Sequence, residues 1–199
     1  MRKLLAILLT TLVSISSFAQ GSVIFNNRTQ AGDRPVTYGA PAQGFGTLPG
    51  ATAQLVLVTG AAGSETFTGL TPTSPFRTGA AAAFFTEISP FIVPGVQPGE
   101  SARFVVRAWA LAASFEEALK TPGAIWGSSA IFTVPELGGT PPGGGLPIPT
   151  PTLDGLNAFT IPEPSTIALG FLGTAALFLR RKRLTSMVSG RWTCESDHP

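Results

Sequence analysis

Glycine and proline interrupt the middle of this chain at short intervals, which favours short strands over long helices. The sequence contains 23 glycines and 18 prolines, and both residues weaken helix and strand interiors. Between the interruptions stand short runs in which apolar and polar residues alternate, as in strands with one buried face. The expected strands are 21–27, 36–38, 51–58, 65–68, 80–85, 101–110 and 125–134, with 80–85 ambiguous between helix and strand.

The segment 101–110 has the clearest alternation in the chain. Its apolar face is formed by Ala102, Phe104, Val106 and Ala108. Its opposite face is formed by Arg103, Val105, Arg107 and Trp109. One apolar face backed by a mixed arginine and tryptophan face is typical of an antiparallel sheet that meets water on one side.

A short helix is expected after this strand. Ser114 occupies an N-cap position with Glu117 three residues later, which is a capping box, and Pro122-Gly123 ends the helix. Several short strands with one small helix are typical of a β-sandwich. We therefore predict a mainly β, antiparallel β-sandwich-like exported domain at 20–134.

The next segment, 135–160, is predicted to be a Pro/Gly-rich linker. Eleven of the seventeen residues in 135–151 are proline or glycine. Such a composition is typical of a stiff, extended spacer. Residues 153–160 could add a weak last strand or continue the stalk.

Residues 1–19 have the features of a signal peptide. The basic pair Arg2-Lys3 precedes an apolar run at 4–13, and small residues precede the end of the segment. We expect export through the Sec translocon and cleavage by signal peptidase between Ala19 and Gln20.

The opposite end of the chain combines an extended motif with an apolar segment. Pro162 and Pro164 flank Glu163, and prolines hold the neighbouring backbone extended. The segment 166–179 carries no charge, so it can form a transmembrane helix in contact with membrane lipid. At about 1.5 Å per residue this helix is shorter than the ~30 Å hydrocarbon core.

A basic cluster follows the apolar segment. Arg180, Arg181, Lys182 and Arg183 are expected to act as a membrane stop and to hold this end in the cytoplasm. The remaining residues, 184–199, are expected to form a disordered cytoplasmic tail.

The Pro-Glu-Pro motif, the short apolar helix and the arginine-rich end, in that order, resemble the PEP-CTERM sorting domain, also named the ice-binding protein C-terminal domain. The resemblance covers about 161–183. It implies a Gram-negative host that secretes polysaccharide, and recognition by an exosortase, a membrane-embedded Cys protease or transpeptidase. An ordinary single-span anchor is the alternative, with the same anchoring and no processing. Segments 23–27, 107–109, 114–118 and 128–134 together resemble PEP-CTERM proteins of unknown function from verrucomicrobia-like bacteria.

The charge of the exported part argues against nucleic-acid binding. The whole chain carries +2, but between residues 20 and 161 six basic residues face eight acidic ones, a net charge of −2. Without a basic stripe there is no electrostatic footprint for nucleic acid. Cys194 and His198, the only cysteine and histidine, lie beyond the anchor. We therefore expect no metal, no cofactor and no disulfide in the exported domain.

Three functions are considered for the exported domain. The leading hypothesis is a structural or adhesive protein of the cell surface or extracellular matrix, which passes through a single-pass intermediate in the inner membrane. The second is a carbohydrate- or ice-binding module, with extracellular polysaccharide as a partner. Its candidate ligand face is Trp109, Trp126 and Tyr38, although each could instead pack at the core or its rim. A hydrolase ranks last, because no nucleophile–base pair or nucleophile motif is present, so we expect no enzyme.

Overall fold

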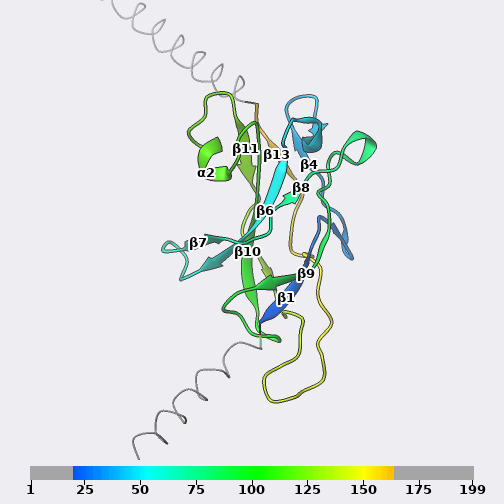
Figure 1. The fold of residues 1–199 in the computed structure, drawn as a ribbon, viewed down its shortest axis with the longest axis vertical. Coiled ribbons are helices and arrows are strands. Elements are labelled where there is room, and N and C mark those ends of the chain that lie inside the picture. The colour runs from blue at the N-terminus through cyan, green and yellow to red at the C-terminus, as the bar shows by residue number, and fades with distance from the viewer. Residues whose placement is uncertain (1–19, 164–199) are drawn as a thin grey trace, which may run out of the picture. The chain divides into compact units, whose positions relative to one another are not determined.

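The computed structural model describes residues 20–163, which form many short strands and one α-helix (Figure 1). The mainly β fold class with a single short helix is therefore confirmed for this part of the chain. The elements in chain order are β1 (Gly21–Phe25), β2 (Arg28–Thr29), β3 (Gly32–Asp33), β4 (Val36–Tyr38), β5 (Gln43–Gly44), η1 (Phe45–Thr47), β6 (Thr52–Thr59), β7 (Thr66–Gly69), β8 (Ser74–Pro75), η2 (Gly79–Ala81), β9 (Ile88–Val93), β10 (Ala102–Ala110), α2 (Phe115–Ala118), β11 (Ile125–Ser128), β12 (Phe132–Val134) and β13 (Phe159–Ile161).

The largest sheet has six strands, with β6 and β10 at its centre. Its main path runs β11-β10-β6-β7, while β12 also pairs with β10 and β8 also pairs with β6. All these pairs are antiparallel, as expected from the alternating pattern. Val106 pairs with Leu55, and both are fully buried, because the alternation places them on the same inner face.

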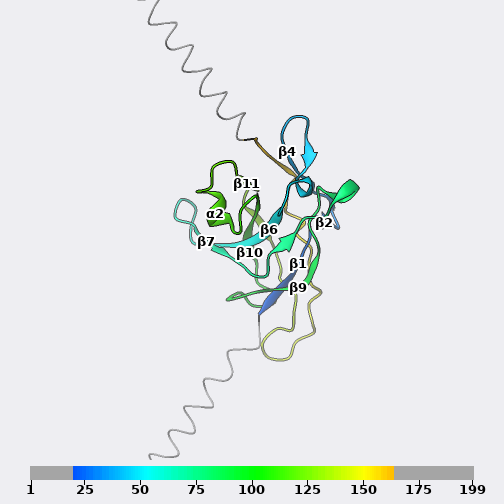
Figure 2. The same cartoon turned by 45° about the horizontal axis from the view of Figure 1, so that its top comes forward.

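Smaller sheets cover the inner face of the large sheet. The antiparallel pair β1–β9 and the three-stranded sheet β13-β4-β5 supply the second layer, and β2 and β3 form a separate hairpin. In Figures 1 and 2, α2 and β7 lie on one side of the β6–β10 pair, and β1 and β9 lie on the other. The buried core between the layers is rich in phenylalanine, and the rings of Phe25 and Phe85 lie 4.6 Å apart.

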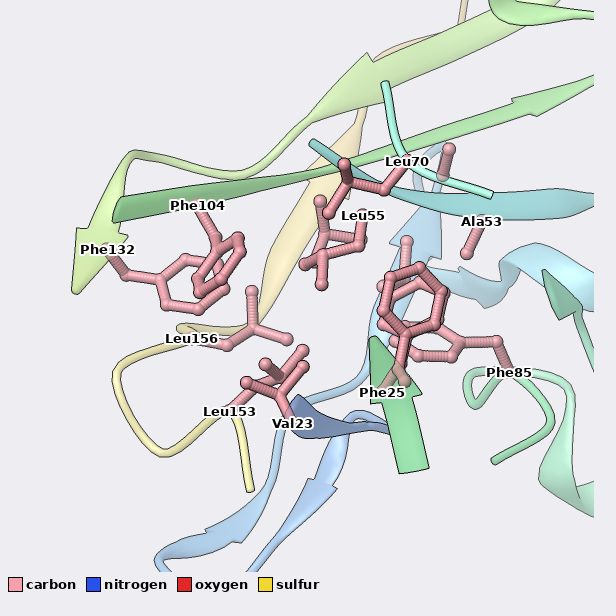
Figure 3. Packing of buried hydrophobic residues seen from close by; sticks show 14 of the residues in the cluster. Val23, Phe25, Ala53, Leu55, Leu70, Phe85, Phe104, Phe132, Leu153 and Leu156 are labelled. Atoms are coloured by element: carbon pink, nitrogen blue, oxygen red, sulfur yellow. The ribbon is translucent and has the colours of Figure 1, made fainter. Parts of the chain in front are cut away.

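The segment 135–160 is not the extended spacer that its composition predicts. Leu137, Leu153 and Leu156 are fully buried in the main core (Figure 3). Figure 3 shows Leu153 and Leu156 pointing into the same cluster as Phe104. The prediction is wrong because the three leucines bury apolar surface, and each Å² removed from water stabilises the fold by roughly 25 cal/mol. This gain does not depend on the proline and glycine residues between them.

Polar contacts also hold this segment against the domain. The amide of Leu137 donates to the carbonyl of Glu100, and Gly138 exchanges two backbone hydrogen bonds with Ser22. The hydroxyl of Thr152 donates to Asp154 at 2.6 Å, and this hydrogen bond lowers the pKa of the Asp154 carboxyl below its usual range. The turn around Leu146 is exposed. The domain boundary therefore falls after Ile161 rather than after Val134.

Two expected strands differ from their predictions. Residues 80–85 form η2 and a turn, because their backbone groups bond to separate partners such as Val36, Gly46 and Arg77 rather than to one neighbouring strand. The expected strand 125–134 is split into β11 and β12. Ser129 stands at the break, where its hydroxyl accepts the amide hydrogen of Val106 on β10.

No helix within residues 20–163 is both long and apolar enough to cross a membrane. The expected transmembrane helix at 166–179, the signal peptide at 1–19 and the tail at 184–199 lie outside the described residues.

Candidate functional site

The outer face of the large sheet carries a cluster that we call the arginine–aromatic face, made of Phe67, Arg107, Phe115 and Trp126. The guanidinium carbon of Arg107 lies 4.7 Å from the ring centre of Phe115 and 5.7 Å from that of Phe67. Its Nη1 lies 3.8 Å from the carboxylate of Glu116. The attraction between a guanidinium and the negative face of an aromatic ring contributes about 0.5–1 kcal/mol at an exposed site, and Arg107 makes this interaction with two rings.

Helix α2 brings Phe115 to this face. The Ser114 side chain accepts a hydrogen bond from the amide of Glu117 at 3.1 Å, so the predicted N-cap is confirmed. The Glu117 carboxylate accepts from the amide of Ala113, one residue before the cap, rather than from Ser114. Phe115 then packs edge-on against Trp126, with ring centres 5.9 Å apart.

The three aromatic candidates for a ligand face do not form one surface. Trp109 and Trp126 are paired across β10 and β11, so they share a face of the sheet. Trp109 is only 4% exposed, however, and is packed beneath Phe115, whereas Trp126 is 45% exposed. Tyr38 lies on β4 in a different sheet and packs edge-on against Phe45 of the main core.

Trp109 therefore has the packing role that the sequence left open, and it cannot present its ring to a ligand in this conformation. Trp126 keeps an accessible ring next to Phe115, the ring that Arg107 also contacts. Phe67 adds a second accessible ring, 44% exposed. Phe67 lies opposite Val58, on the outer side of β6. The alternation of residues 66–69 would instead place their one large apolar side chain on the core face, so no signal in the sequence indicates this position.

A second notable region is the junction between the folded domain and the Pro-Glu-Pro motif. Strand β13 pairs in parallel with β4, and its final residue, Ile161, is 1% exposed. A Cβ added to Gly127 would lie 2.8 Å from Cγ1 of Ile161, so this isoleucine is packed closely against β11. Pro162 follows at once and is exposed, and Glu163 is partly buried.

The remaining predicted targeting residues are mostly outside the described part of the chain. Gln20, the expected new N-terminus, is exposed and directly precedes β1. Ala19, Pro164 and the basic residues Arg180, Arg181, Lys182 and Arg183 lie outside the described residues. Within residues 20–163, no group of three or more acidic, histidine or cysteine side chains is arranged to hold a metal ion.

Comparison with known protein families identifies the C-terminal segment. Residues 160–183 match the family model described as the PEP-CTERM protein-sorting motif. The chain carries a PEP-CTERM sorting motif. The match begins at Thr160, inside strand β13, so the sorting motif and the folded domain share their border residues.

The PEP-CTERM motif supports an exported protein that is processed by an exosortase. No curated protein matches this chain, and no solved structure matches its fold. The family match therefore describes how the protein is sorted, and the surface of the β domain is the remaining guide to what the domain does.

Proposed function

We propose that this protein is a non-catalytic surface or matrix protein, anchored in the inner membrane during sorting and then released by an exosortase to the cell surface or extracellular matrix. There, its β domain has a structural or adhesive role. The observation that carries the proposal is the PEP-CTERM motif, which directly follows a folded β domain. A sorting signal joined to a domain with a packed core delivers that domain as the functional part.

Adhesion through carbohydrate is the second candidate, and the arginine–aromatic face favours it. Exposed rings supply apolar area at a low entropy cost, and sugar rings present C–H faces that can stack on them. Trp126 and Phe67 are about half exposed, and Arg107 lies between Phe67 and Phe115. The Arg107 guanidinium and the Glu116 carboxylate add a donor group and an acceptor group at the same place.

Retention of the protein by the matrix tests both candidates. We expect the released protein to sediment with matrix polysaccharide from its host. If the face binds carbohydrate, Trp126→Ala weakens retention about fivefold to tenfold, because an aromatic contact contributes about 1–1.5 kcal/mol. Ile92→Ala is the matched control, since Ile92 is equally exposed on β9, outside the large sheet.

The outcomes separate the two candidates. If Trp126→Ala leaves retention unchanged, the adhesive surface lies elsewhere on the domain and the arginine–aromatic face does not bind carbohydrate. Wild-type protein that stays wholly in the medium contradicts the adhesive role itself.

A further inference from the structure

Strand β13 connects the fold of the domain to the position at which the protein is processed. The family match starts at Thr160, but Thr160 and Ile161 are already hydrogen-bonded residues of the domain. A protease binds its substrate in an extended conformation. The backbone groups of the substrate must then be free to hydrogen-bond to the enzyme, as when a peptide adds a strand to the edge of a sheet. Residues held in β13 do not meet this requirement while the strand is in place.

Several contacts of β13 keep it in place. The amide of Gly39 donates to the carbonyl of Ile161 at 3.1 Å, and the amide of Phe159 donates to the carbonyl of Pro35. The hydroxyls of Thr37 and Thr160 lie 2.9 Å apart and share a hydrogen bond. Ile161 is buried in the main core, so removing β13 from the sheet would expose apolar surface.

The chain beyond Ile161 differs from β13. The compact unit ends at Ile161, and Pro162 is exposed. Proline has no N–H donor, so residue 162 cannot extend the hydrogen bonding of β13 from its own amide. The strand pairing of β13 therefore ends at Ile161.

We propose that β13 limits where the exosortase can cut, so that the scissile peptide bond lies C-terminal to Pro162. This inference depends on the exosortase processing described above. In the reaction, one peptide bond of the motif breaks. Its carbonyl carbon passes to water or to an amine-bearing acceptor, and the nitrogen takes a proton to become the amino terminus of the remainder. The released domain keeps a complete β13.

The test is the C-terminal residue of the protein released by its native host, determined by mass spectrometry. We expect every terminus at Pro162 or beyond in the wild type. We expect Ile161→Ser, which weakens β13, to give a mixed population with additional termini within 135–160. The matched control is Ile131→Ser, which changes an exposed isoleucine and should leave a single terminus.

The possible outcomes distinguish this inference from the proposed function. Wild-type release with a terminus at or before Ile161, or an unchanged terminus in Ile161→Ser, contradicts the role of β13 while exosortase processing stands. Absence of any release contradicts the processing, and this inference with it. If Ile161→Ser does not accumulate, limited digestion of the full-length wild type by a protease of broad specificity gives a second test. The fragment that carries β13 should stay in the resistant core and end at Ile161 or later, even where the exposed turn around Leu146 is cut. A fragment of the resistant core that begins after this turn and ends before Ile161 contradicts the inference.

Discussion

Replacing Asn27 with alanine is expected to lower the free energy of unfolding by about 3 kcal/mol, because three backbone groups would each lose a hydrogen bond to a buried side chain. The Asn27 side chain is fully buried. Its Nδ2 donates to the carbonyls of Arg34 and Ala83, and its Oδ1 accepts from the amide of Phe85. One side chain thus holds the β2–β3 hairpin and the turn before β9 against the end of β1.

Thermal unfolding of the exported domain, residues 20–163, would measure this effect, and a loss of 3 kcal/mol corresponds to roughly 10 °C in a domain of this size. Asn27→Asp should also destabilise the domain at neutral pH, because a carboxylate oxygen would then face two carbonyl oxygens. Thr29→Ala serves as the control, since the Thr29 hydroxyl donates an exposed hydrogen bond to the carbonyl of Gly32. A midpoint for Asn27→Ala within about 1 °C of the wild type would mean that Asn27 does not organise this region.

Replacing Glu163 with alanine is expected to reduce release from the membrane by more than tenfold while leaving export intact. Glu163 stands between two prolines, two residues after the last buried residue of β13. If the exosortase recognises this carboxylate, losing a charged partner in a closed site costs about 2–5 kcal/mol, which is more than a tenfold effect.

The measurement is the division of the protein between membrane and medium in the native host, together with its size. Glu136→Ala is the matched control, because Glu136 is an exposed acid of the folded domain, outside the sorting motif. If Glu163→Ala and the wild type are released equally, or if the wild type keeps its full mass in the membrane, the segment acts as a plain anchor.

The central sheet could be predicted because its signal is local. The alternation in 51–58 and 101–110 assigns one face of each strand to the core, and β6 and β10 place Leu55 and Val106 there. Ser114 and Glu117 likewise mark the start of α2 within four residues. These features depend on the spacing of apolar residues and on the residue that caps the helix, and both can be read directly from the sequence.

The second layer could not be predicted in the same way because its contacts are distant in sequence. Strand β9 contains Pro90 and pairs with β1 at the start of the domain, so its partner decides its structure. Asn27 lies just after the end of β1, but its three hydrogen bonds reach residues 34, 83 and 85. No local pattern indicates which of several asparagines will be buried.

The structure of the segment after Val134 does not follow from its composition. Proline and glycine dominate 135–151, yet Leu137, Leu153 and Leu156 are fully buried. Gly155 also lies where a Cβ would meet the carbonyl oxygen of Thr133 at 2.9 Å, so the glycine allows the segment to approach β12 closely. Widely spaced leucines between flexible residues were the signal that could have identified this part of the core.

The candidate site was only partly predictable for a related reason. The alternation of β10 places Arg107 and Trp109 on the outer face, as the sequence predicts. Whether Trp109 is accessible depends on α2, which folds back so that Phe115 covers it. Trp126 remains half exposed in the same cluster, and only the pairing of β11 with β10 reveals that the two tryptophans are neighbours.

The exported domain continues to the first residues of its sorting motif, without a spacer. Hydrogen exchange of residues 20–163, followed by mass spectrometry, distinguishes such a domain from one that ends in a flexible linker. We predict that the amides of Leu137, Gly138 and Phe159, which donate to Glu100, Ser22 and Pro35, exchange as slowly as those of β6. The exposed turn around Leu146 should exchange quickly. If peptides from the whole of 135–161 exchange at the rate of an unfolded chain while β6 and β10 stay protected, the segment is a spacer and the account is wrong.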